Sequence, residues 1–321
     1  MHNKYDYIIS VDNLLCAWRE FLCGKRNRTD VAEFSLHLMD NIFKLHTDLK
    51  NKTYKHGSYK PFRISDPKPR DVHKASVTDR LLHHAIYRVL YPYFDRKFIY
   101  ESYSCRNLKG THRAINRFKY FVQKVSKNNT RTCCILKCDI KKFFANIDHE
   151  TLKNILAKHI KDRDVLWLFS KIIYSFDSGY VGVGLPLGNL TSQLLVNIYM
   201  NEFDYYVKRE LKCKYYIRYA DDFVILSADS AYLENLLPKI SKFLLNNLKL
   251  QIHPNKVFIK TINSGLDFLG WVHFSHHRVL RTSTKRRMLN ALREKDVKKE
   301  TIQSYLGLVS HGNTYKIFLN I

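Results

Sequence analysis

Two adjacent aspartates lie between apolar segments, where an unpaired charge is costly. Asp221 and Asp222 separate the apolar runs at residues 215–217 and 223–226, a pattern that predicts a strand, a tight turn and a second strand with both acids at the tip. Burying a lone carboxylate costs several kcal/mol or more, so paired carboxylates usually hold a metal ion or share a proton. We therefore expect a cation beside these two side chains.

A third carboxylate, Asp139, lies at the end of another apolar run, at residues 135–140. Three acids on strand ends can hold two Mg²⁺ ions, because hard cations take oxygen ligands and a metal pair stabilises the attacking and leaving oxygens of phosphoryl transfer. The alternative is a solvated hairpin turn, since Asp is a common turn residue. The tetrad Tyr-Ala-Asp-Asp at residues 219–222, in its apolar setting and with the motifs around it, favours the catalytic interpretation.

The motifs around this tetrad resemble those of a reverse transcriptase, and from about residue 50 to the C-terminus they occur in that family's order. Two fingers motifs come first, followed by the first catalytic motif of the palm, a glycine-rich motif, the catalytic hairpin, and the primer grip with the motif before it. In chain order these segments are residues 66–70 with 79–80, 102–106 with 109–112, 138–149, 184–193, 219–222, 253–256 and 267–271. The resemblance implies an α+β right-hand polymerase with fingers, palm and thumb.

Among the reverse transcriptases, the chain resembles the enzyme of diversity-generating retroelements. Its glycine-rich motif ends in Ser-Gln at residues 192–193 and carries Leu187 where retroviral and group II intron enzymes have glutamine. The segments 304–307 and 311–316 are similar to the C-terminal end of that family, whereas Ala220 departs from the valine of many relatives. The resemblance implies an RNA-directed DNA polymerase that uses dNTPs to copy a template RNA with errors at adenines. It also implies a small, basic, helical accessory protein that forms an oligomer.

Two other functions remain open at this point. One is a reverse transcriptase of a bacterial antiviral defence system, which copies a noncoding RNA. The other is a basic RNA-binding protein that has kept only the shape of a polymerase. The intact set of three acids, Asp139, Asp221 and Asp222, argues against the last of these.

The resemblance also implies roles for side chains near the acids. Asp139, Asp221 and Asp222 would be the catalytic acids, and with Ile140 they would bind two Mg²⁺ ions, for which Mn²⁺ can substitute. Phe144 would lie against the sugar, where its ring excludes a 2′-hydroxyl and selects deoxynucleotides. The alternative for Phe144 is core packing.

The remaining candidates contact nucleotide or nucleic acid. Lys256 resembles a lysine that protonates the leaving pyrophosphate, a candidate general acid. The nucleotide pocket is expected to contain Lys68, Arg70, Leu187, Gly188 and Gln193. For the segment that ends at Gln193, the competing interpretation is a helix N-cap role for Thr191 or Ser192. The basic residues expected to contact nucleic acid are Lys285, Arg286 and Arg287.

The charge balance agrees with a nucleic-acid enzyme. The chain has 54 Lys and Arg against 29 Asp and Glu, for a formal net charge of +25. Such an excess favours polyanions, because Lys and Arg that neutralise phosphates release counterions. With 45% hydrophobic residues in 321, the chain can bury a large core in two or three subdomains and is not a disordered basic tail.

The cysteine spacing and the N-terminal residues indicate the cellular compartment in which the protein is expected. The seven cysteines show no paired Cys-x-x-Cys spacing, so we expect free thiols in a reducing compartment and no structural zinc. The N-terminal residues lack a long apolar segment and a small-residue cleavage site, so neither secretion nor membrane spanning is indicated. We expect a cytoplasmic protein that is bacterial or phage-encoded. Histidines that lack partners at metal-ligand spacing are expected to be ordinary helix and loop residues: His83, His84, His273, His276 and His277.

Hydrophobic periodicity predicts the elements that position these residues. Helices are expected at residues 11–22, 31–49, 77–90, 111–125, 149–161 and 190–211, with a strand at 130–140, a hairpin at 214–227 and extended chain at 50–70. From Arg281 onward nine Lys or Arg and three Asp or Glu predict a basic helical thumb. The expected divisions are an N-terminal helical extension at 1–50, fingers and palm at 51–265, and primer grip and thumb at 266–321.

Overall fold

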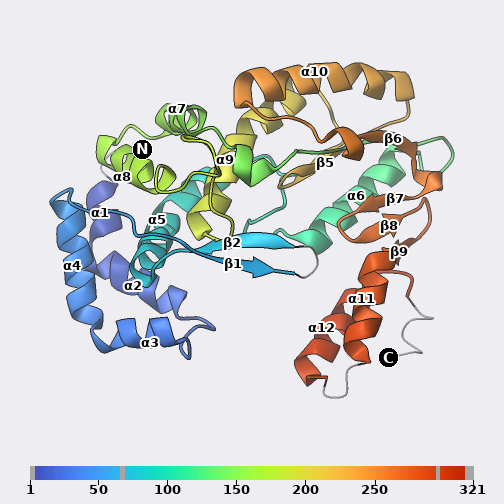
Figure 1. The fold of residues 1–321 in the computed structure, drawn as a ribbon. Helices are drawn as coiled ribbons and strands as arrows, with labels where there is room; N and C mark the ends of the chain where they lie inside the picture. Colours follow the sequence, from blue (N-terminus) through green and yellow to red (C-terminus); the bar gives the residue numbers. More distant parts are fainter. Residues whose placement is uncertain (1–3, 66–68, 294–296, 315–321) are drawn as a thin grey trace. The chain divides into compact units, whose positions relative to one another are not determined.

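Helices and strands follow one another largely in the order that the hydrophobic pattern predicts (Figure 1). The computed structural model describes residues 4–65, 69–293 and 297–314. The chain divides into two units that interleave along the sequence. The first contains Met1–Ile99, Ile140–Tyr206 and Lys242–Gln251, and the second contains Tyr100–Asp139, Val207–Ser241 and Ile252–Ile321. The linear division at residues 50 and 265 stays a prediction.

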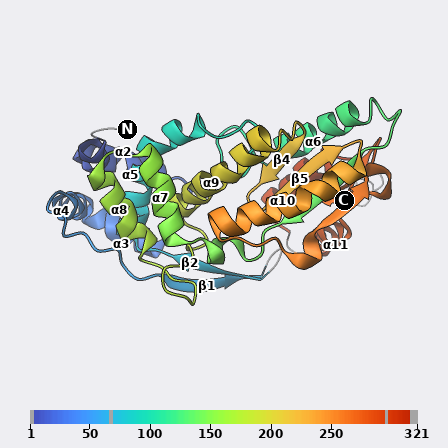
Figure 2. The ribbon, with the colours of Figure 1, turned by 90° about the horizontal axis from the view of Figure 1, so that it is seen from above.

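The first unit is mainly helical. Its N-terminal helices are α1 (Tyr5–Ile9), α2 (Val11–Phe21), α3 (Thr29–Leu36) and α4 (Leu38–Lys50). They are followed by an antiparallel hairpin of β1 (Lys60–Ile64) and β2 (Arg70–Lys74) and by α5 (Val77–Asp95). The unit continues with the 3₁₀ turn η1 (Phe143–Asn146), α7 (His149–His159), α8 (Arg163–Ile173) and α9 (Leu190–Tyr205). Helices α7 and α8 lie side by side, as Figure 2 shows from above.

The prediction of one helix at 31–49 is wrong. The backbone of His37 (φ −118°, ψ 39°) leaves the helical region, so α3 ends at Leu36 and α4 begins at Leu38. The break has a packing reason, because α3 contacts α5 whereas α4 contacts α1 and α2. One straight helix could not place its apolar stripe on both sets of partners.

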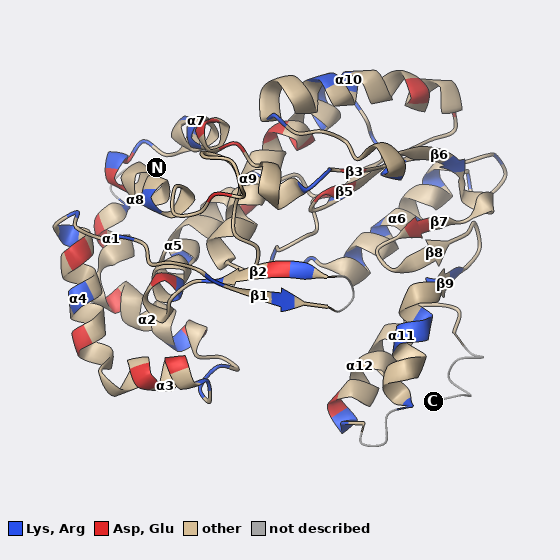
Figure 3. Ribbon diagram, in the orientation of Figure 1, with Lys and Arg blue, Asp and Glu red and all other residues tan. Residues whose placement is uncertain are grey.

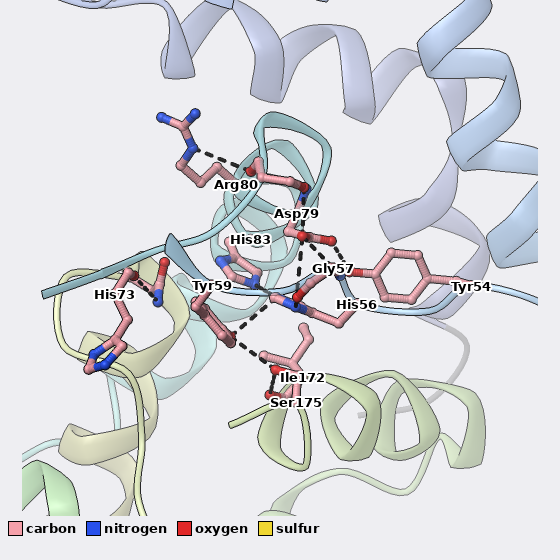
Figure 4. A network of polar contacts seen from close by, with 12 residues as sticks. Tyr54, His56, Gly57, Tyr59, His73, Asp79, Arg80, His83, Ile172 and Ser175 are labelled. Atoms are coloured by element: carbon pink, nitrogen blue, oxygen red, sulfur yellow. Dashed lines mark hydrogen bonds and ion pairs between the residues drawn. The ribbon is translucent and has the colours of Figure 1, made fainter. Parts of the chain in front are cut away.

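Buried polar side chains join the segment before β1 to α5 in the first unit (Figure 4). Asp79 accepts hydrogen bonds from the Tyr54 hydroxyl (2.7 Å) and the Ser76 hydroxyl (2.6 Å). The His56 and His83 rings stack, and their Nε2 atoms lie 3.3 Å apart. Asp79 therefore anchors the fold, although it belongs to a motif expected in the fingers.

Antiparallel sheets and their covering helices make up the described part of the second unit. The elements of its first sheet and its surroundings are α6 (Thr111–Val125), β3 (Cys134–Asp139), the π turn η2 (Tyr206–Glu210), β4 (Tyr216–Tyr219), β5 (Asp222–Ser227), α10 (Ser230–Leu248, shared with the first unit), η3 (Pro254–Lys256) and β6 (Phe258–Thr261). After the turn η4 (Ile262–Ser264) come β7 (Leu266–Phe268), β8 (Trp271–His273), β9 (Arg278–Leu280), α11 (Thr282–Leu292) and α12 (Lys299–Val309). The helix predicted at 190–211 thus ends as α9 at Tyr205 and continues as a π turn.

The first sheet has the strand order β4-β5-β3-β6 and packs on α6. Phe118 and Phe121 of α6 share a buried cluster with Ile135 of β3, Val224 of β5 and Phe268 of β7. Every second residue of a strand faces the same side, so Ile135 of β3 and Val224 and Leu226 of β5 belong to this cluster although both strands are continuous buried runs. The cluster fixes the strands whose ends carry the acids.

The second sheet has the order β7-β8-β9 and leads directly into α11. Trp271 and Leu280 of this sheet pack with Ile115 of α6, Met288 of α11 and Val309 of α12. Two helices therefore follow the region predicted as primer grip, and the first of them, α11, is basic. Their assignment as a thumb stays a prediction.

Among the described residues, no helix combines the length and apolar character that crossing a membrane requires. The cysteines are free thiols.

Candidate active site

The antiparallel ladder of the first sheet brings two of the acids face to face. Asp139, the last residue of β3, is in register with Asp222, the first residue of β5, and Asp222 also pairs with Tyr219 of β4. Ala220 and Asp221 form the turn between β4 and β5. The hairpin predicted from the two apolar runs is confirmed, with the two acids at its tip.

The turn is strained at Ala220 and supported by a buried arginine. Ala220 has φ 55°, in the left-handed region that L-residues visit at a cost of about 1–2 kcal/mol. Arg218 is fully buried, and its guanidinium donates to the carbonyl of Ala220 (3.2 Å) and to the hydroxyl of Ser102 (3.0 Å). Sequence reasoning missed Arg218, although a charged residue in the apolar run before the acids was a usable signal.

The cations beside the acids are lysines. The ammonium group of Lys137 lies 3.1 Å from Oδ2 of Asp222, and that of Lys256 lies 2.9 Å from Oδ1 of Asp139. Lys137 is 8% exposed and belongs to β3, whereas the side chain of Lys256 is 46% exposed. Positive charge thus lies next to Asp222 and Asp139, whereas the expected metal ions stay a prediction. Lys137 is a second residue that sequence reasoning missed.

Burial dominates the electrostatics of Asp222. Desolvation raises the pKa of its carboxyl to about 6, Lys137 opposes this shift, and the neighbouring Asp139 and Asp221 add to it. A carboxyl that titrates so close to neutrality is costly to ionise unless a cation is near. The site therefore favours binding of positive charge.

The donor atoms suit a divalent cation of the hard class. Oδ1 of Asp222 is buried and has no hydrogen-bond partner in the described part of the chain. Carboxylate oxygens are the ligands that Mg²⁺ and Mn²⁺ prefer. Within residues 4–65, 69–293 and 297–314, however, no three acidic, histidine or cysteine side chains already converge on one point. Ile140 has a buried apolar side chain, so only its backbone carbonyl could contact a metal ion.

In the first unit, Leu187 and Gly188 of the glycine-rich segment contact strand β2, which Arg70 begins. The backbone amide of His73 in β2 donates to the carbonyl of Leu187 (3.1 Å). A Cβ atom on Gly188 would lie 2.7 Å from Cγ1 of Val72, and Gly188 has φ +104°, so only glycine fits this close approach without strain. Arg70 begins the same strand β2 and is exposed. Lys68 lies outside the described residues.

Phe144 lies in the 3₁₀ turn η1, next to the buried Phe143. Its own side chain is only partly buried, and its carbonyl accepts a hydrogen bond from the amide of Leu185 (2.8 Å). The two rings meet edge to face at 5.6 Å. Phe143 thus fills the core position, and the role of Phe144 against a sugar stays a prediction.

Gln193 lies in the first turn of α9, where its backbone amide donates a hydrogen bond to the backbone carbonyl of Asn189 (3.2 Å). The N-cap of α9 is Asn189, and Thr191 and Ser192 are buried beyond it. The N-cap interpretation of Thr191 and Ser192 is therefore wrong. Burial does not explain a polar side chain at position 191 either, because the hydroxyl of Thr191 has no hydrogen-bond partner among the described residues.

The basic residues expected to bind nucleic acid lie on α11 (Figure 3). Lys285 and Arg286 are exposed, Arg287 is partly buried, and α11 contains no acidic residue. Met288 of the same helix is fully buried in the cluster with Trp271. The helix is thus held by an apolar face and presents a positive one.

Comparison with known proteins identifies a family and several relatives of similar sequence. Residues 63–273 match the family described as reverse transcriptase (RNA-dependent DNA polymerase). Protein YkfC of Escherichia coli (strain K12) is 27% identical over 276 residues, which cover 71% of this chain and 70% of YkfC. The group II intron-encoded protein LtrA of Lactococcus lactis subsp. cremoris is 28% identical over 229 residues, which cover 66% of this chain and only 36% of LtrA.

Solved structures extend the similarity to the fold. The apo telomerase from Candida tropicalis, truncated from its C-terminal domain, has a TM-score of 0.52 at 12% identity, covering 76% of this chain and 60% of that chain. The telomerase from Candida albicans in complex with a TWJ fragment of telomeric RNA has a TM-score of 0.52 at 11% identity, covering 76% of this chain and 51% of that chain. At this identity the match shows the fold alone, that of a right-hand polymerase. Since the family match spans most of the chain, this protein belongs to the reverse transcriptase family and is an RNA-directed DNA polymerase.

Proposed function

We propose that Asp139, Asp221 and Asp222 are the catalytic carboxylates of this polymerase and hold two Mg²⁺ ions, for which Mn²⁺ can substitute. The observation that carries the proposal is the register of β3 with β5, which sets Asp139 opposite Asp222 with Asp221 in the adjoining turn. When bound, the two cations would stabilise the attacking and leaving oxygens of nucleotidyl transfer. Ile140 would add its backbone carbonyl to this set.

The lysine next to Asp139 has a separate role in the proposal. Lys256 is an exposed ammonium group on a flexible side chain, so it can leave Asp139 and donate a proton to the departing pyrophosphate. Its contact with Asp139 keeps it near the reacting groups before that step. The proposal thus assigns Lys256 as general acid.

Residues of the first unit would bind the nucleotide. Lys68 and Arg70 would clamp the triphosphate, Arg70 through its bidentate fork. Phe144 would exclude the 2′-hydroxyl, and Gly188 would allow close approach of the backbone near the base pair. Gln193 would support the pocket from the first turn of α9, and Lys285, Arg286 and Arg287 would contact the phosphates of the template RNA and of the RNA/cDNA duplex.

We further propose that the enzyme is the error-prone polymerase of a diversity-generating retroelement, which works with a small, basic, helical, oligomeric accessory protein. Leu187 and the Ser-Gln end of the glycine-rich motif support this assignment. Leucine offers a nascent base pair only apolar contact, whereas glutamine can hydrogen-bond and restrain base geometry. A site without directional contacts discriminates less between correct and misfit pairs.

The test is to copy a defined RNA with the wild-type enzyme and with Leu187→Gln and to count errors at each template base. We expect frequent errors opposite adenine in the wild type and fewer in Leu187→Gln, with a modest loss of rate. Leu185→Met, a substitution in a buried residue of the same motif, is the control and should leave the error spectrum unchanged. An accurate wild type would overturn the mutagenic assignment in favour of an antiviral defence enzyme that copies a noncoding RNA.

A further inference from the structure

Lys137 is a buried lysine at a position where its strand otherwise carries apolar side chains and Asp139. It lies two residues before Asp139, so both side chains emerge on the same side of β3. A buried ammonium group is stable only where partners replace its water. Its partners therefore indicate what the residue does.

Two acceptors hold the Lys137 ammonium group, and they belong to different sheets. One is Oδ2 of Asp222 on β5, at 3.1 Å, and the other is the backbone carbonyl of Asp267 on β7, at 2.6 Å. Strand β7 is an edge strand of the three-stranded sheet. The side chain of Asp267 forms an ion pair with Arg281, immediately before α11. Lys137 thus links the acid site to the strand that leads toward the thumb.

The contact with Lys137 also makes the two oxygens of Asp222 unequal. Oδ2 is taken by Lys137, whereas Oδ1 is buried without a hydrogen-bond partner among the described residues. The terminal torsion of an aspartate is soft, so one fixed oxygen decides where the other points. Residues that orient a metal ligand in this way typically alter metal affinity or activity when they are changed.

We propose that Lys137 is a positioning residue of the polymerase site: it fixes Asp222 through Oδ2, with its second anchor on β7, so that Oδ1 is the oxygen presented to a divalent cation. The inference rests on the proposed role of Asp222 as a metal ligand. Mg²⁺ demands near-ideal octahedral geometry, so a misaligned carboxylate penalises it more than it penalises Mn²⁺. The ratio between the two metals therefore reports the orientation of Asp222.

The experiment compares Lys137→Met, Lys137→Gln and Lys137→Arg with wild type. Lys260→Met is the matched control, because Lys260 is an exposed lysine of the neighbouring strand β6 whose ammonium group lies over the ring of Phe258. Two quantities are measured: the rate of single-nucleotide extension per folded molecule at saturating dNTP, with Mg²⁺ or Mn²⁺, and the affinity of the protein without nucleic acid for each metal by calorimetry. Melting curves determine the folded fraction.

We expect Lys137→Met and Lys137→Gln to lose about tenfold or more in the Mg²⁺ rate and clearly less in the Mn²⁺ rate, with the Mn²⁺ to Mg²⁺ affinity ratio raised in parallel. Lys137→Arg keeps the charge and should stay near the wild-type ratio, as should Lys260→Met. Two neutral variants, Lys137→Met and Lys137→Gln, are used so that the test remains possible if one of them does not fold. A purely structural role predicts a lower melting temperature with both metal ratios unchanged, and that result would overturn the inference.

Asp222→Asn separates this inference from the site assignment on which it rests. If Asp222→Asn polymerises at the wild-type rate, the assignment of Asp222 itself fails. If Asp222→Asn is inactive while Lys137→Met has wild-type rates and metal ratios, only the role of Lys137 fails.

Discussion

At the scale of single residues, three cationic side chains contact the acids and the turn that carries them. Arg218 supports the strained turn at Ala220, Lys137 holds Asp222, and Lys256 contacts Asp139. Each cation lies within hydrogen-bond distance of the backbone or carboxylate that it supports. The acids are therefore organised by side chains that have no direct part in the proposed chemistry, with Lys256 as the exception.

Phe144 offers a residue-scale test of sugar selection. Phe144→Ala should raise the use of ribonucleotides relative to deoxynucleotides, because it removes the ring proposed to clash with a 2′-hydroxyl. The measurement is the ratio of incorporation rates for matched rNTP and dNTP. Phe143→Leu is the control, since Phe143 is the buried neighbour and its change should affect stability alone. An unchanged ratio in Phe144→Ala would assign this ring to packing.

At the scale of elements, the sequence predicted the helices and strands whose packing follows from a regular apolar pattern. Helix α6 has the predicted bounds, because Ala114, Ile115, Phe118 and Val122 repeat at helical spacing and all are buried. The break at His37 could not be predicted, because it depends on which helices α3 and α4 meet. The same dependence on the fold explains why only part of the site could be predicted. The acids were visible as charges in apolar runs, whereas the partners of Lys137 come from strands that only the fold brings together.

Buried histidines in α5 and β8 predict acid sensitivity. Burial lowers the pKa of His83 well below its usual value and that of His273 to about 4, so both stay neutral in the folded protein. The unfolded chain binds their protons first, and stability is therefore present above pH 6.5 and lost as pH falls below it. Each group can contribute up to about 1.4 kcal/mol per pH unit. Asp222 works in the opposite sense, because its raised pKa of about 6 lets the folded state bind a proton first.

Urea unfolding between pH 7 and pH 5 measures the balance. Burial also lowers the pKa of His84 to about 4, so three histidines against one carboxyl should give a net loss of stability. His83→Gln should flatten the pH dependence, since it removes one of the titrating groups. Stability that holds constant or increases down to pH 5 would contradict the assignment of neutral buried histidines.

At the scale of the whole molecule, the excess of 54 Lys and Arg over 29 Asp and Glu favours binding to polyanions. The charge is not evenly spread. Helix α11 is basic and without acids, whereas α3 carries acidic residues and no Lys or Arg, and α4 carries both signs (Figure 3). Sequence composition predicts a negatively charged partner, and the fold shows one helix, α11, that can present positive charge to such a partner.

Charge reversal on α11 tests this surface. Changing Lys285, Arg286 and Arg287 to Glu should weaken binding of unrelated RNAs alike, because attraction to phosphates is sequence-independent. The slope of log affinity against log salt should shrink by roughly one for each phosphate that is no longer neutralised. Lys44→Glu, a reversal at an exposed lysine of α4, is the control for net charge. Weaker binding of one RNA sequence only would indicate base readout instead.

The most direct measurement is RNA-templated incorporation of a single deoxynucleotide by Asp139→Asn, Asp221→Asn and Asp222→Asn, each beside a binding assay for the same primer and template. Asp229→Asn is the matched control, because Asp229 is an acid of the second unit whose side chain accepts a hydrogen bond from the backbone amide of Tyr232. With the three acids as the carboxylates that hold the catalytic cations, each of the first three variants should lose about a hundredfold or more in rate while binding and folding persist, and Asp229→Asn should keep the wild-type rate. Incorporation within about tenfold of wild type in any of the three would contradict the role assigned to that residue.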